Sequence, residues 1–186
     1  MDKPKIFDII RFSADKRRYY PASIGRQSWM TDNFLNHTEI NITLGQSRYG
    51  GPILDLPENI DIPHNLRFAA QLDLSKFSPF DKTDLLPKTG QLIFFADIRS
   101  DTGKVIYSPL SNDKLKRYIV EHEDNFFDGV LIDTVYADIE TFDERFVDSG
   151  DNEKTWNDFA GSEKSKIFGV YTHCQYGFEK IKKITF

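Results

Sequence analysis

The chain has 186 residues, of which 39% are hydrophobic, so it can form one sizeable core but not two. Its formal net charge of −5 argues against a nucleic-acid-binding protein, because such proteins usually present a basic face. The single cysteine excludes a disulfide scaffold and favours a reducing cytoplasm, and the lack of any run of about 18 apolar residues excludes a membrane helix.

The first third of the chain mixes periodic and irregular segments. Within residues 2–16, apolar side chains cluster with charges between them, which predicts a short amphipathic helix, with a strand as the alternative. Residues 17–39 have no clean period and are predicted to form a loop. Residues 39–44 alternate apolar and polar side chains and predict a half-buried strand. From residue 45 to 63, three glycines and three prolines indicate irregular structure.

Two apolar strands are predicted in the middle of the chain, Leu66–Leu74 and Gln91–Ile98. The first strand should carry Gln71 and Asp73 on one face and apolar side chains on the other, namely Leu66, Phe68, Ala70, Leu72 and Leu74. The second is almost wholly apolar and predicts a central strand that is covered on both faces.

Phe94 and Phe95 should therefore both be buried, one on each face of that strand. A turn at residues 99–103 and a strand at residues 104–108 should complete a hairpin. Further strands are predicted at residues 117–122, 130–139, 167–173 and 181–186. Because strands follow one another through turns, the sequence predicts an α+β domain with a mostly antiparallel, bent sheet and few peripheral helices.

The glycine-rich turn Ser47–Pro52 is a candidate anion site, in which Arg48 and the N–H groups of Gly50 and Gly51 would contact the ligand. The turn lacks the Lys-Ser/Thr ending of a phosphate loop, and no helix follows it. The alternative is structural: the two glycines supply positive φ angles where the chain reverses before a proline.

A second candidate site combines Gln71, Asp73 and Asp97 on adjacent strands. Three converging polar groups could bind a polar ligand in a cleft. The alternative is that these side chains satisfy backbone groups at the end of the sheet. A hydrolase would use Asp73, Asp97 and a histidine, but the sequence offers no base paired with a nucleophile.

No metal site, cofactor or catalytic residue is predicted. The four histidines form no His-x-x-x-His pair and no glutamate-paired motif. Residues 97–103 loosely imitate a calcium loop, but Ser108 stands where the bidentate glutamate belongs. His173 and Cys174 are neighbours in a predicted strand, so their side chains should point to opposite faces and not form a nucleophile–base pair.

The acidic stretch Asp143–Glu153 is a candidate docking patch for a basic protein partner. Asp148, Asp151 and Glu153 would carry the interaction, which would speed association more than it deepens affinity. The alternative is a solvated connecting loop.

Three motifs carry a family resemblance. Ser47–Pro52 reads Ser-Arg-Tyr-Gly-Gly-Pro, the strand Leu66–Leu74 contains Gln-Leu-Asp-Leu, and residues 86–97 read Leu-Pro-Lys-Thr-Gly-Gln-Leu-Ile-Phe-Phe-Ala-Asp. These residues resemble the YwqG-like family of bacterial domains of unknown function. The resemblance covers Gly45 to Ser108, roughly a third of the chain.

The resemblance implies a single YwqG-like domain over residues 1–186. We expect it to be a soluble, cytoplasmic binding or interaction module without catalytic chemistry. Some family members travel with bacterial toxin systems, which implies an immunity or antagonist role. Ile62-Pro63 stands where the family usually has Trp-Pro, and the family's second Leu-Leu-Gln-Ile-Asp strand is missing. The chain is therefore either a short member or a fragment of a longer one.

Overall fold

The computed structural model describes residues 5–30, 34–97, 102–142 and 165–169. The strands are β1 Lys5–Pro21, β2 Thr38–Ile40, β3 Arg48–Tyr49, β4 Ile53–Leu56, β5 Arg67–Asp73, β6 Gln91–Asp97, β7 Thr102–Ser108, β8 Lys116–Ile119, β9 Val130–Phe142 and β10 Ser165–Ile167. The helix α1 spans Leu74–Phe77, and the 3₁₀ turns are η2 Ser78–Phe80, η3 Asn112–Lys114 and η4 Glu123–Asn125.

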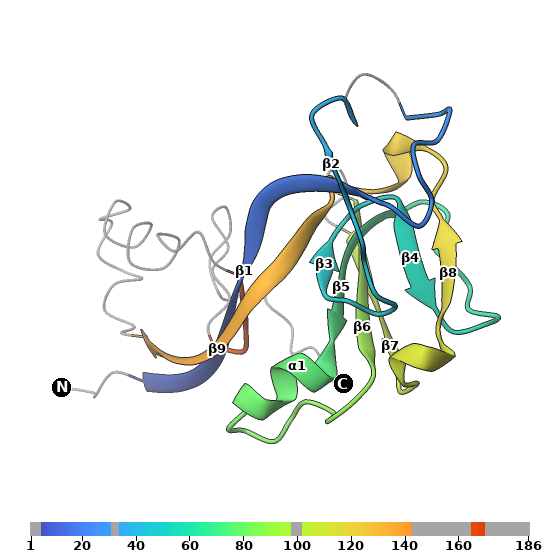
Figure 1. Ribbon diagram of the computed structural model, residues 1–186. Helices are drawn as coiled ribbons and strands as arrows, with labels where there is room; N and C mark the ends of the chain where they lie inside the picture. The colour runs from blue at the N-terminus through green and yellow to red at the C-terminus, as the bar shows by residue number, and fades with distance from the viewer. Residues whose placement is uncertain (1–4, 31–33, 98–101, 143–164, 170–186) are drawn as a thin grey trace.

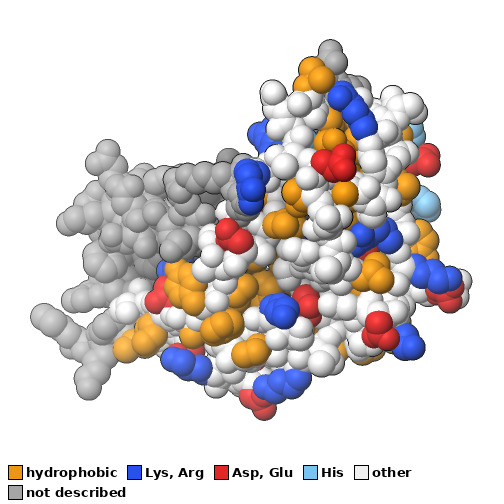
Figure 2. Space-filling view, in the orientation of Figure 1, with side chains coloured by type: hydrophobic (Ala, Val, Ile, Leu, Met, Phe, Trp, Pro, Cys, Tyr) orange, Lys and Arg blue, Asp and Glu red, His pale blue; other side chains and the backbone are white. Residues whose placement is uncertain are grey.

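Most strands belong to one antiparallel sheet in the order β10-β1-β9-β3-β5-β6-β7, and β2 adds to the end of β1 in parallel. A second, two-stranded sheet pairs β4 with β8. The long strands β1 and β9 form a curved arm that reaches away from the body of the molecule, while β4 and β8 lie at the opposite side (Figure 1). Hydrophobic side chains gather over this arm in Figure 2, and Ile6 and Ile139 are 68% and 55% exposed.

The mostly antiparallel, sheet-rich architecture was predicted, but the helical content was overestimated. The described residues contain a single α-helix of four residues, so the fold is sheet-dominated rather than α+β. None of the described helices is long and apolar enough to cross a membrane. The predicted strands at residues 66–74, 91–98, 104–108, 117–122 and 130–139 correspond to β5, β6, β7, β8 and β9.

The helix predicted within residues 2–16 is wrong, because residues 5–16 form the start of β1. The strand pairs with β9 along one edge and with β10 along the other. Ile9 and Ile10 are neighbours, so they point to opposite faces, yet each is only 1% exposed. A strand buried on both faces loses the alternation of apolar and polar residues, and its apolar cluster then imitates a helix.

A β-bulge corrects the predicted faces of β5. Phe68 pairs with Phe95 and Ala70 pairs with Phe94, so Ala69 is an extra residue without a partner on β6. Phe68 therefore lies on the same face as Gln71 rather than with Ala70 and the other apolar residues. Downstream of the bulge, Gln71 and Asp73 share a face as predicted.

The main sheet has a hydrophobic cluster on each face. One cluster lies between this sheet and the β4–β8 pair and consists of Met30, Phe34, Leu54, Leu56, Phe68, Ile93, Phe95 and Phe126. The other lies against α1 and consists of Ile10, Phe12, Leu72, Leu74, Phe77, Leu86 and Ile132. Phe95 is 3% exposed in the first cluster, and Phe94 is half-buried against the second. The two rings therefore face opposite sides as predicted, but Phe94 is less buried than predicted.

The loop between η2 and β6 is closed by Asp81. Its carboxylate accepts hydrogen bonds from the Thr83 backbone and hydroxyl groups and from the Leu86 backbone N–H. Partial burial alone would raise the pKa of Asp81, but these bonds outweigh it and hold the pKa below its ordinary value of 3.8. The ionised carboxylate therefore stabilises the loop.

Candidate functional site

A buried polar network runs through the centre of the molecule, and Arg48 on β3 is its first member. Arg48 is fully buried, and its guanidinium donates to the Gln71 side chain at 2.9 Å and to the Gln46 carbonyl at 2.7 Å. It also lies 3.3 Å from Asp55, with its Cζ atom 5.7 Å from the centre of the Phe68 ring. Arg48 is therefore sealed from solvent and is not placed to meet a soluble anion.

Asp55 on β4 joins Arg48 to a second arginine. Its two oxygens accept from Arg117 Nε at 2.8 Å and Nη2 at 3.0 Å, and the Gly45 N–H donates to it at 3.0 Å. Arg117 on β8 also donates to the Ile42 and Thr43 carbonyls. The carboxylate thus links three separate chain segments. Burying such charges is costly unless they are paired, as they are here.

From Gln71 the network continues toward the surface. The Gln71 amide contacts Gln91 at 3.1 Å, Gln91 donates to Asn112 at 2.6 Å, and Asn112 donates to Asp73 at 2.8 Å. Asp73 also caps α1 by accepting the Ser75 N–H at 3.0 Å. The network therefore fixes Asp73 and Asn112 in place.

The glycine turn serves the fold at this point. Gly50 and Gly51 have φ angles of +43° and +89°, which side-chain-bearing residues rarely adopt. A Cβ atom on Gly50 would overlap the Phe127 carbonyl oxygen, and one on Gly51 would lie 2.5 Å from the Tyr19 hydroxyl. The turn allows Arg48 to enter the interior, which agrees with the structural alternative for this motif.

The network ends at a polar cleft, with a volume of about 630 Å³, where the segment before β3, the end of β5, α1 and β9 meet. It is lined by Thr43, Gln46, Ser47, Asp73, Ser75, Lys76, Phe80, Asn112, Ile132, Asp133 and Val135. Of the predicted trio, only Asp73 reaches this cleft, since Gln71 lies behind it with no exposed surface. Asp97 pairs with Thr102 at the opposite end of β6, about 20 Å away at 3.3 Å per residue.

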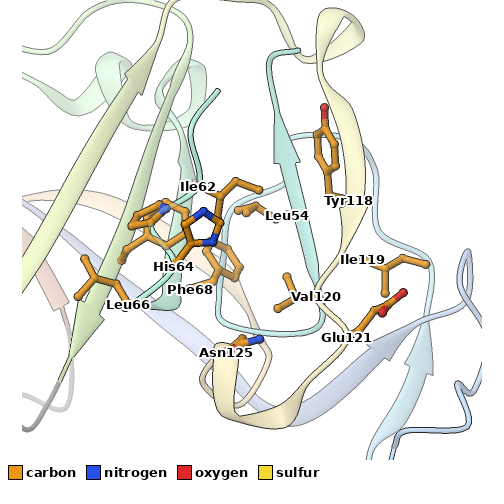
Figure 3. A pocket seen from close by; sticks show the side chains of 12 residues that line it. Leu54, Ile62, His64, Leu66, Phe68, Tyr118, Ile119, Val120, Glu121 and Asn125 are labelled. Carbon is orange, nitrogen blue, oxygen red and sulfur yellow. The ribbon is translucent and has the colours of Figure 1, made fainter. Parts of the chain in front are cut away.

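An apolar groove lies where the β4–β8 pair diverges from the main sheet. Its lining residues are Leu54, Ile62, Pro63, His64, Leu66, Phe68, Phe95, Tyr118, Ile119, Val120, Glu121 and Asn125. Ile62, His64 and Leu66 stand on one side, and Ile119, Val120 and Glu121 stand on the other (Figure 3). Leu54, Phe68 and Phe95 belong to the main hydrophobic cluster, so the groove opens directly onto the core.

In the described part of the chain, the rim of this apolar groove has two carboxylates: Glu121, which lines the groove, and Asp61, which precedes the lining residue Ile62 in the chain. Within the described residues, neither of these two carboxylates has an ion-pair partner. Arg67 is already 3.4 Å from Asp124, and Lys116 pairs with Glu58. The rim therefore presents negative charge that the nearby basic side chains do not offset.

The sequence analysis predicted no function for the residues that line this groove. It also did not predict that Asp55 and Arg117 form an ion pair whose carboxylate is buried. One signal was available for Asp55, because it is a lone carboxylate within the apolar run Ile53–Leu56. Such a residue in a buried strand needs a cationic partner. The groove had no comparable signal, since its walls come from four separated segments.

Other predicted sites can be located only in part. The docking residues Asp148, Asp151 and Glu153, together with His173 and Cys174, lie outside the described residues. Within the described part of the chain, no three His, Cys, Asp or Glu side chains gather as they would around a metal ion.

The described residues form a sheet-dominated domain with an internal polar network, a polar cleft and an apolar groove. Comparisons with family models, with curated proteins and with solved structures found no match to this chain.

Proposed function

We propose that this protein is a binding module without catalytic chemistry, which recognises a segment of a partner protein in the apolar groove. The observation that carries the proposal is a groove whose floor is the hydrophobic core and whose mouth is open. Ile119 is 43% exposed at this mouth, although it is a large apolar side chain. A partner side chain that entered the groove would remove this surface and the groove walls from water.

The partner segment has a definite chemistry. It carries a large apolar side chain for the groove and neighbouring Lys or Arg residues for Glu121 and Asp61 on the rim. A basic segment gains from unpaired carboxylates, whereas an acidic one is repelled. The acidic residues Asp148, Asp151 and Glu153, proposed as a docking patch, would favour the same basic partner.

The biological setting follows from the family resemblance. We propose that the chain is a YwqG-like domain of the bacterial cytoplasm, acting as an immunity or antagonist protein of a toxin system. A buried side-chain anchor surrounded by complementary charge would suit that role, because tight and selective binding is what an antagonist needs.

The alternative function was a hydrolase or polar-ligand binder that uses Asp73, Asp97 and Gln71. The separation of Asp73 from Asp97 argues against a site that uses both carboxylates. The burial of Gln71 argues against its direct contact with a ligand. The binding-module proposal does not depend on these residues.

Selection from a random peptide display library tests the proposal. Selected peptides should share a large apolar residue flanked by Lys or Arg, and Ile119→Asp should weaken their binding at least about tenfold. Val105→Asp is the matched control, because Val105 is 56% exposed on β7 and outside the groove. If no such motif is enriched, or if both variants bind equally well, the proposal is wrong.

A further inference from the structure

The polar cleft at the end of the network shares no lining residue with the apolar groove. Its floor is rigid, because Ser47 accepts the Asp73 N–H at 2.9 Å and the Asp73 carboxylate is held by Ser75 and Asn112. Gln91, which has no exposed surface, fixes Asn112 from behind. Because this floor is already ordered, ligand binding need not order these protein side chains.

Two opposite charges in this cleft are not engaged with the protein. Lys76 comes from α1 and Asp133 comes from β9, and both side chains are exposed. Within the described residues, neither has an ion-pair or hydrogen-bond partner, and they do not form an ion pair with each other. Gln46 uses its amide oxygen to accept from Thr43, which leaves its NH₂ group to face a ligand.

The cleft also has an apolar wall. Phe80 follows α1 in the chain, while Ile132 and Val135 lie on β9 beside Asp133. Ile132 belongs to the hydrophobic cluster against α1, and Phe80 and Val135 pack on that cluster. Within the described part of the chain, a ligand in the cleft would therefore meet the free cation of Lys76, the free carboxylate of Asp133, the already hydrogen-bonded carboxylate of Asp73 and an apolar surface.

We propose that this cleft binds a small zwitterion of the α-amino-acid type with an apolar side chain. The ligand carboxylate pairs with Lys76, its ammonium group pairs with Asp133, and its apolar portion packs on Phe80, Ile132 and Val135. A simple anion would pair with Lys76 but would lie near the carboxylates of Asp133 and Asp73, and a simple cation would leave Lys76 without a partner. The cleft's volume of about 630 Å³ lies within the range of small-molecule sites.

The test is an NMR titration of the ¹⁵N-labelled protein with L-leucine, with N-acetyl-leucine and leucinamide as ligands that each lack one charge. L-leucine should shift the amide signals of Ser75, Lys76 and Asp133. Lys76→Gln and Asp133→Asn should each weaken the binding of L-leucine at least about tenfold. N-acetyl-leucine and leucinamide should bind the wild type more weakly than L-leucine by a similar factor. Lys104→Gln on β7 is the matched control and should bind like the wild type.

The charge assignment makes a sharper prediction. Asp133→Asn should not further weaken the binding of N-acetyl-leucine, because this ligand has no ammonium group. Lys76→Gln should weaken the binding of N-acetyl-leucine, because its carboxylate is still present. No saturable shift with L-leucine at about 10 mM, a concentration suited to weak millimolar binding, would overturn the proposal. Equal binding of L-leucine by wild type and both cleft variants would also overturn it. Peptide binding in the groove would be unaffected by either result.

Discussion

Replacing Asp55 by Asn tests the role of the buried network in stability. The substitution keeps the size of the side chain but removes the charge that faces Arg117 at 2.8 Å and 3.0 Å and Arg48 at 3.3 Å. Its new NH₂ group would also face guanidinium N–H groups, which cannot accept a hydrogen bond. Breaking a fully buried pair in this way costs about 3–5 kcal/mol.

For a chain of this size, each kcal/mol lowers the melting temperature by about 2–4 °C, so Asp55→Asn should lower it by about 6–20 °C. Thermal unfolding followed by circular dichroism measures this shift. Asp124→Asn makes the same chemical change in an ion pair whose carboxylate is 94% exposed and should leave the melting temperature nearly unchanged. If both variants melted within about 2 °C of the wild type, less than the shift for 1 kcal/mol, the network would not be a structural centre.

Three further predictions test the core, the glycine turn and a surface loop. In urea denaturation, Phe95→Ala should cost about 3–5 kcal/mol and the half-buried Phe94→Ala clearly less, and equal costs would contradict the burial of the two rings. Gly50→Ala should lower the free energy of unfolding more than Gly25→Ala. Both glycines have a positive φ, but a Cβ would overlap the Phe127 carbonyl oxygen at Gly50 and would meet nothing within 4 Å at Gly25. Because the pKa of Asp81 is lowered in the folded protein, its ionised carboxylate should stabilise the loop above about pH 4 and lose this effect as the pH falls through the lowered pKa. NMR signals of the loop amides measured across this pH range would show the change.

The sequence predicted the middle of the sheet well because its strands have strong local signals. The pairing of β6 with β7 was predicted from an apolar run, turn-forming residues and a second strand pattern, which are all local features of the sequence. The segment Lys5–Pro21 was misjudged because burial on both faces comes from distant chain segments. The bulge at Ala69 could not be predicted either, since it depends on the register that β6 imposes on β5.

The candidate site was predictable only where polar residues stand on one strand. Gln71 and Asp73 were placed correctly on a common face, but their partners Asn112 and Gln91 come from elsewhere in the chain. Asp97 was grouped with them because it ends the next strand. In an antiparallel pair, the end of one strand lies beside the start of the other, so Asp97 lies at the opposite end of the β5–β6 pair from Asp73.

Chemical-shift mapping with a selected basic, apolar peptide tests the central claim most directly. If the groove is the binding site, amide signals of residues 62–68 and 118–121 should change together on titration, while those of β7 and of the β1–β9 arm stay in place. The changes should weaken as salt is raised, because the rim charges would be screened over about 8 Å at physiological ionic strength. Shifts confined to β7 or to the arm, with the groove residues unaffected, would contradict the account.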